Sequence, residues 1–163
     1  MLKSFLLITF IFLINFILNY YYLNLRNKNN KYNEKFTNEL MNNSMGTILI
    51  TFSFLKLLNL NNFTIIFSKY NIISKNFILY AYCYPFLELI IGILLLYKIK
   101  LSYLVLIVLM SVSLISVSIS LYKGKNLKCG CLGSYFHLPL SYITIFENII
   151  MLTMSLYQLH LVS

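Results

Sequence analysis

The chain has 163 residues, of which 60% are hydrophobic and only 10% are charged. This composition excludes a soluble domain of ordinary makeup, because stretches of about 20 residues, the length that spans a bilayer, run almost without charge. The net charge of +9 does not indicate a nucleic-acid-binding protein, because the basic residues lie in short segments beside the apolar runs and form no basic module. Contact with the lipid bilayer and its anionic headgroups explains them more simply.

The first apolar run, residues 5–18, follows Lys3 and resembles the start of a secretory signal. It ends on Asn19 and three tyrosines, an aromatic cluster suited to a membrane interface, and lacks the small residues of a cleavage site. We therefore predict an uncleaved N-terminal transmembrane helix over residues 1–23. Residues 24–44 are polar and basic without hydrophobic periodicity, which predicts a linker.

Residues 45–163 predict a membrane domain of four helices. The helices are expected at residues 45–60, 77–97, 101–122 and about 139–162, with residues 63–67 along the membrane interface. The second and third of these form a tight hairpin, because only Ile99 with a lysine on either side separates them. The predicted fold class is an all-α membrane protein, with a four-helix transmembrane core preceded by an additional N-terminal helix.

Cys129 and Cys131, in the loop before the last helix, are the main candidates for chemistry. With one residue between them they can close a small, strained disulfide, and strain raises the reduction potential. Three lysines nearby favour the reactive thiolate. Three interpretations stay open: thiol–disulfide exchange, a static clip, and a zinc or copper(I) site completed by His137. The sequence holds no Ser-His-Asp order, glycine-rich phosphate loop or His-Glu helix motif, so it does not indicate hydrolytic or nucleotide chemistry.

Cys83 lies about six residues into its predicted helix, or roughly 9 Å below the membrane surface at ~1.5 Å per residue. Helix order puts it on the same side as the cysteine loop, so it is a candidate partner thiol. A buried cysteine is more often a small apolar core residue, and we expect Cys83 to be one.

Three ionisable residues, Lys56, Glu88 and Glu147, lie inside predicted spans. Such groups are costly in hydrocarbon and face the bundle interior, so we expect them to meet near the midplane, with Lys56 paired to one of the two glutamates. A structural ion pair is the first interpretation, and a proton relay or a polar cap on a quinone are the alternatives. Pro85, Glu88 and Gly92 share one helix face and predict an interhelical seam. No cofactor is predicted.

The first helix has one lysine before it and four basic residues after it. This asymmetry puts the linker in the cytoplasm and the cysteine loop on the non-cytoplasmic side.

Several short motifs together resemble a known family. They are Phe52-Ser53-Phe54-Leu55-Lys56-Leu57, Tyr70-Asn71-Ile72-Ile73, Tyr84-Pro85-Phe86-Leu87-Glu88-Leu89 with Gly92, and Cys129-Gly130-Cys131-Leu132-Gly133. Their order and spacing, over residues 45–157, resemble the methylamine utilisation protein E (MauE) family, related to the DoxX-like redox-associated membrane proteins. Members commonly have a basic residue before the asparagine of the last helix, whereas this chain has Glu147 before Asn148, so no role carries over to that position.

The resemblance implies a multipass protein of a bacterial-type inner membrane that works with thioredoxin-like partners. It also implies support for disulfide formation in exported clients such as the methylamine dehydrogenase small subunit. An alternative function is a non-catalytic assembly or chaperone subunit, in which Cys129 and Cys131 form a static clip. Thiol–disulfide exchange is therefore the one enzymatic activity that the sequence suggests, and nothing in it shows amine metabolism.

Overall fold

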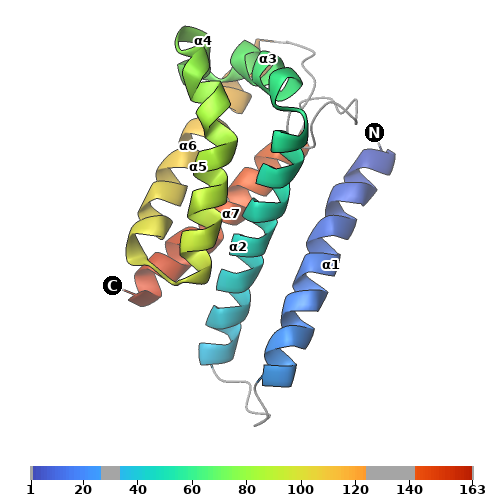
Figure 1. The fold of residues 1–163 in the computed structure, drawn as a ribbon, viewed down its shortest axis with the longest axis vertical. Coiled ribbons are helices and arrows are strands. Elements are labelled where there is room, and N and C mark those ends of the chain that lie inside the picture. The colour runs from blue at the N-terminus through green and yellow to red at the C-terminus, as the bar shows by residue number, and fades with distance from the viewer. Residues whose placement is uncertain (1, 27–33, 124–141, 163) are drawn as a thin grey trace.

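The computed structural model describes residues 2–26, 34–123 and 142–162, and every element in these ranges is a helix. The helices are α1 (Leu2–Arg26), α2 (Glu34–Leu58), α3 (Leu60–Tyr70), α4 (Ile72–Asn76), α5 (Ile78–Leu96), α6 (Lys100–Tyr122) and α7 (Tyr142–Val162). The described part of the chain thus confirms the all-α fold class. Figure 1 shows α1, α2, α5, α6 and α7 running along the long axis, while α3 and α4 lie at one end of the bundle.

Two helices, α5 and α6, are each long and apolar enough to cross a membrane. Both match the predicted spans to within a residue at each end. The α2–α3 pair meets the same criterion when taken as one bent span, so the described residues contain two or three candidate spans, as expected of an integral membrane protein. Membrane crossing by α1 and α7 stays a prediction.

The polar linker predicted up to Ser44 is wrong in its second half, because α2 begins at Glu34. Four side chains of this polar stretch are buried, namely Phe36, Leu40, Asn42 and Ser44. The two apolar ones pack with Leu23 of α1 in a small cluster separate from the main core. The amide of Asn42 donates to the Leu95 carbonyl at 2.8 Å and accepts from the Tyr103 hydroxyl at 2.8 Å. Tertiary partners therefore stabilise the first turns of α2, which lack an apolar run.

The chain turns by 106° between α2 and α3, which lays α3 across the end of the bundle (Figure 1). Asn59 leaves the helical conformation at this bend, with φ −139° and ψ 60°. The buried face of α3 carries Phe63, Phe67 and Tyr70, which recur at helical spacing. Asn71 then starts α4, because its side chain accepts hydrogen bonds from the backbone amides two and three residues on.

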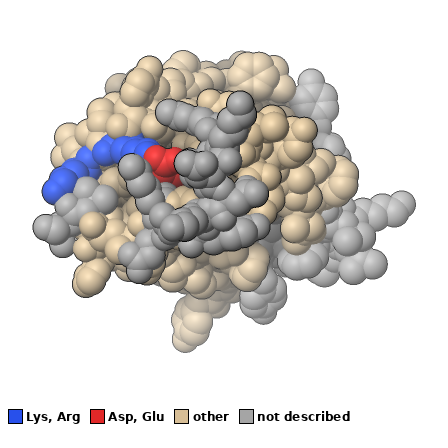
Figure 2. Space-filling view, turned by 90° about the horizontal axis from the view of Figure 1, so that it is seen from below, with Lys and Arg blue, Asp and Glu red and all other residues tan. Residues whose placement is uncertain are grey.

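The turn between α5 and α6 is as tight as the sequence predicts. Lys98 adopts a left-handed conformation with φ 57°, and the Ile99 amide donates back to the Leu94 carbonyl at 3.2 Å. This is the hydrogen-bond pattern of a Schellman motif, here without the usual glycine. The Lys98 ammonium also reaches Glu39 of α2 at 2.7 Å. Figure 2, a view of this end, shows basic side chains beside an acidic one, and the other described residues visible on this face are uncharged.

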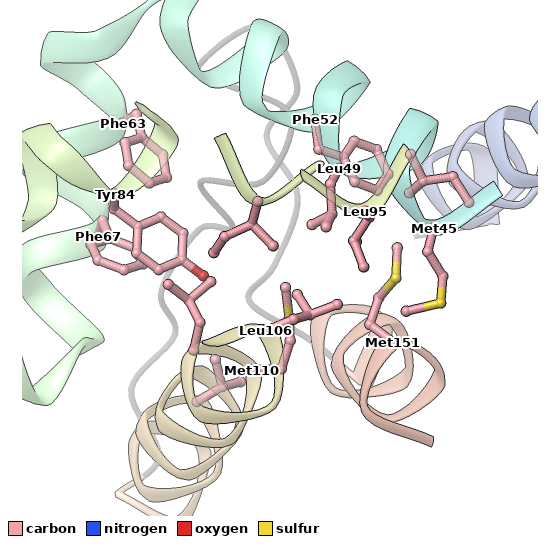
Figure 3. Packing of buried hydrophobic residues seen from close by; sticks show 14 of the residues in the cluster. Met45, Leu49, Phe52, Phe63, Phe67, Tyr84, Leu95, Leu106, Met110 and Met151 are labelled. Carbon is pink, nitrogen blue, oxygen red and sulfur yellow. The ribbon is translucent and has the colours of Figure 1, made fainter. Parts of the chain in front are cut away.

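The main core forms where α2 packs on α5 and α6 packs on α7. Figure 3 shows side chains from all four helices meeting there, with Met45, Leu95 and Met151 toward one end. The α2–α5 contact is close because two glycines face each other: a Cβ on Gly92 would lie 3.0 Å from the Gly46 carbonyl oxygen. Backbones that approach this closely allow extensive van der Waals contact between helices.

The N-terminal helix α1 packs along α2. A polar contact joins the two helices, because the Asn19 side chain donates to the Thr47 hydroxyl at 3.0 Å and that hydroxyl also contacts Asn15. In an apolar surrounding such a contact fixes how the helices face each other. The outer face of α1 exposes large apolar side chains, including Leu13, Ile17 and Leu18, which suits contact with lipid acyl chains.

Candidate functional site

The most unusual feature of the interior is an ion pair between Lys56 of α2 and Glu88 of α5. The Lys56 ammonium lies 2.7 Å from one carboxylate oxygen of Glu88 and 2.5 Å from the other. Both residues are buried. The structure thus selects Glu88 from the two partners that the sequence offered. Lys56 also sits in the last turn of α2, where a positive charge interacts favourably with the helix dipole.

Aromatic rings surround the ion pair on the side of α3. The Lys56 ammonium lies 5.2 Å from the ring centroid of Tyr84 and 5.7 Å from that of Phe63, within the range of cation–π attraction. Phe67 packs on Tyr84 with ring centroids 4.5 Å apart. Figure 3 shows the hydroxyl of Tyr84 pointing away from the two phenylalanine rings and toward α6. The rings of Phe63, Phe67 and Tyr84 thus cover the ion pair on this side.

Glu147 of α7 reaches the same place. It lines a cavity of about 20 Å³ together with Lys56, Glu88, Tyr70 and residues of α6, a space with room for about one water molecule. Asn148, the next residue, donates to the Ser113 hydroxyl of α6 at 3.1 Å. We call Lys56, Glu88 and Glu147 the charge cluster. It can hold charge inside an apolar bundle, and its cavity suits a small polar guest such as water.

Lys56 and Glu147 lie near helix ends at the α3 side of the bundle, whereas Glu88 lies near the middle of α5. Lys56 is two residues from the end of α2, and Glu147 is five residues from the start of α7, or roughly 3 and 8 Å along the helices at ~1.5 Å per residue. The predicted depth of each ionisable residue in the membrane is its distance along the helix from the predicted start of its apolar run. The real α2 begins eleven residues earlier and turns into α3 directly after Lys56, so the same residue lies near an end.

The predicted interhelical seam on α5 makes two kinds of contact, a close packing contact and an ion pair. Pro85, Glu88 and Gly92 are all buried, and Gly92 meets the backbone of α2 at Gly46. Glu88, one helical turn before Gly92, pairs with Lys56 in the charge cluster. The seam therefore serves both the close α2–α5 packing and the ion pair.

The expectation that Cys83 is a buried core residue is wrong, because Cys83 is an exposed free thiol on α5. Residues on either side of it alternate between core and surface as α5 turns, and Ala81 and Tyr84 take the inward positions. In an apolar helix both faces have similar composition, so the sequence does not distinguish a lipid-facing cysteine from a core one. Its role as a partner thiol stays a prediction.

Cys129, Cys131 and His137 lie outside the described residues, so their geometry and the metal alternative are not tested by the structure. Within the described ranges, no three His, Cys, Asp or Glu side chains come together as metal ligands.

Four polar residues of the site did not stand out in the sequence as functional candidates. They are Tyr70, Tyr84, Ser113 and Asn148, all of which line the cavity. Tyrosine, serine and asparagine recur throughout this chain, so composition gave no signal. Tyr70, Tyr84 and Asn148 occur in the segments that carry the family resemblance, but only the packing of α3, α5, α6 and α7 brings the four residues to one point.

Comparison with protein families identifies the family of this chain. Residues 35–160 match the family model described as methylamine utilisation protein MauE. The chain belongs to the MauE family. The MauE match starts at residue 35, beside the observed start of α2 at Glu34 and ahead of the predicted domain start at Met45. The first turns of α2 are thus part of the MauE domain. No curated protein and no solved structure matches the chain significantly.

Proposed function

We propose that this MauE-family chain supports thiol–disulfide chemistry, or the disulfide-dependent maturation of exported proteins, in a bacterial-type inner membrane. One observation carries the proposal: the family match over residues 35–160 includes the Cys129-Gly130-Cys131 motif. The sequence places this motif between the end of α6 at Tyr122 and the start of α7 at Tyr142. The rest of the matched region contributes the helices that hold the motif at a membrane.

The exchange reaction needs two thiols and a partner disulfide. One cysteine attacks the partner disulfide as a thiolate, a mixed disulfide forms, and one partner thiolate leaves. The second cysteine then attacks the mixed disulfide and releases the other partner thiolate. Cys129 and Cys131 end as a disulfide and the partner as a dithiol, so two electrons pass to the partner, and the reverse direction balances in the same way. Three lysines in the same segment, Lys123, Lys125 and Lys128, favour the attacking thiolate.

The proposed partner is a thioredoxin-like protein, and the clients are exported proteins that require disulfides, of the methylamine dehydrogenase type. We place the cysteine segment on the non-cytoplasmic side, because four basic residues follow the first helix and one precedes it. A membrane-impermeant thiol reagent applied to intact cells is expected to label Cys129 and Cys131 after reduction. Labelling only after the cells are opened would contradict this orientation.

The redox proposal is tested by trapping thiols in cells with an alkylating mass tag, before and after reduction. We expect a mixture of dithiol and disulfide for the Cys129–Cys131 pair, and a loss of disulfides in exported clients when both are replaced with serine. Cys83→Ser is the matched comparison, because this thiol lies outside the motif and is exposed on α5; a loss of client disulfides in this variant would support its role as a partner thiol. A pair that stays fully reduced, with normal client disulfides in the double serine variant, would overturn the proposal. A pair that stays fully oxidised would support the static clip instead.

A further inference from the structure

The charge cluster contains one carboxylate more than it has cations to pair. Lys56 contacts both carboxylate oxygens of Glu88. Glu147 lines the same cavity, yet among the described residues its carboxyl group has no ion pair and no hydrogen bond. If all three groups were ionised, the cluster would carry a net charge of −1 inside an apolar bundle.

Among the described residues that line the cavity, no other group supplies the missing positive charge. The titratable residues that line the cavity come from four helices: α2 contributes Lys56, α3 contributes Tyr70, α5 contributes Tyr84 and Glu88, and α7 contributes Glu147. The lining residues from α6 are Met110 and Ser113, which do not titrate near neutral pH. The tyrosines are neutral at that pH. Lys56 is therefore the single cation among the described residues that line the cavity.

Glu147 is half-buried, and a carboxyl group taken out of water without a counter-charge lowers the cost of desolvation by neutralising. Two carboxylates that share one site also repel each other, which favours a proton on one of them while the other stays ionised. Glu88 accepts the ammonium of Lys56 on both oxygens, so the ionised form suits Glu88 and the acid form suits Glu147. The cavity has room for about one water molecule, which gives the acid form a hydrogen-bond acceptor and a path for exchange.

We propose that the charge cluster is a proton-binding site, in which Glu147 holds one exchangeable proton at neutral pH while Lys56 and Glu88 stay ionised. The ligand of the site is a single proton, and its binding makes the cluster electrically neutral. None of its three residues belongs to the cysteine motif, so the proposal stands independently of the thiol–disulfide function.

The composition of the chain makes the proposal accessible to infrared spectroscopy. The sequence contains four acidic side chains, Glu34, Glu39, Glu88 and Glu147. A protonated carboxyl group has a C=O stretching band well separated from that of a carboxylate. The full-length protein in lipid nanodiscs at neutral pH is expected to show this band with the intensity of one group, and the band is expected to shift in heavy water because the proton exchanges.

Three substitutions are expected to change the number of protons that the charge cluster binds. Glu147→Gln is expected to abolish the band. Glu88→Gln is also expected to abolish it, because Lys56 is then left with Glu147 as its partner and Glu147 ionises. Lys56→Met is expected to double the band, because neither carboxyl group then has a counter-charge. Glu39→Gln is the control, since Glu39 pairs with Lys98 at the exposed end of the bundle, and it is expected to leave the band unchanged.

The proposal is overturned if the wild-type protein has no such band, if the band survives Glu147→Gln, or if it does not shift in heavy water. Circular dichroism establishes that each variant retains its helices. Should Lys56→Met fail to fold, the two near-isosteric glutamine variants still decide the question. The double serine variant of Cys129 and Cys131 is expected to show an unchanged band, which separates failure of this proposal from failure of the redox function.

Discussion

Removing one partner of the ion pair between Lys56 and Glu88 should destabilise the bundle strongly. The side chains of this pair are 8% and 4% exposed, whereas those of the Lys98–Glu39 pair are 49% and 26% exposed. Breaking a buried pair by removing one partner costs about 3–5 kcal/mol, because the other charge is left buried without compensation. A surface pair contributes about 0–1 kcal/mol. The two ion pairs of this chain therefore allow a matched comparison within one protein.

We expect Lys56→Met to lower the free energy of unfolding by about 3–5 kcal/mol. The upper part of this range is favoured, because the ammonium also lies over the rings of Tyr84 and Phe63. Glu88→Met is expected to cost less, since Glu147 lines the same cavity and is available to Lys56. The double variant is expected to recover most of the loss, because two apolar residues of similar volume then fill the site.

The assay is unfolding of the purified protein in micelles by a denaturing detergent, followed by circular dichroism. Helix content is the suitable signal, because the chain has 14 tyrosines and no tryptophan. Lys98→Met is the control and is expected to change the free energy of unfolding by about 1 kcal/mol or less. The reasoning is refuted if Lys56→Met behaves like this control, or if the double variant is no more stable than Lys56→Met.

Three further predictions concern the packing of the helices. Gly92→Leu is expected to destabilise the protein by about 1–3 kcal/mol, because even a Cβ there would lie 3.0 Å from the Gly46 carbonyl oxygen; an unchanged unfolding midpoint would argue against the close approach. Tyr103→Phe removes the hydroxyl that donates to Asn42 at 2.8 Å, with an expected cost of about 1–3 kcal/mol in the same detergent titration. Ser53→Ala is expected to be neutral or stabilising, because the buried hydroxyl of Ser53 has no hydrogen-bond partner among the described residues; a loss above about 1 kcal/mol would reveal an unrecognised contact.

The sequence alone determined the features that depend on long apolar runs. The spans that became α5 and α6, and the tight turn at Lys98, follow from about 20 apolar residues on either side of a short basic break. It also identified Lys56, Glu88 and Glu147 as residues that need partners, because ionisable groups are rare in apolar helices. The family was recognised from the order and spacing of its motifs, and the match over residues 35–160 confirms it.

The tertiary structure decided which faces of the helices point inward. A helix in a membrane is apolar on its lipid face and on its core face, so periodicity did not show that Cys83 points outward and Tyr84 inward. The start of α2 at Glu34 depends on contacts with α1, α5 and α6, which no local pattern in a polar segment reveals. The choice of Glu88 over Glu147 as the partner of Lys56 likewise depends on how α2, α5 and α7 meet below α3. The sequence supplies the three ionisable residues, whereas helix packing pairs Lys56 with Glu88 and leaves the carboxyl group of Glu147 outside this pair.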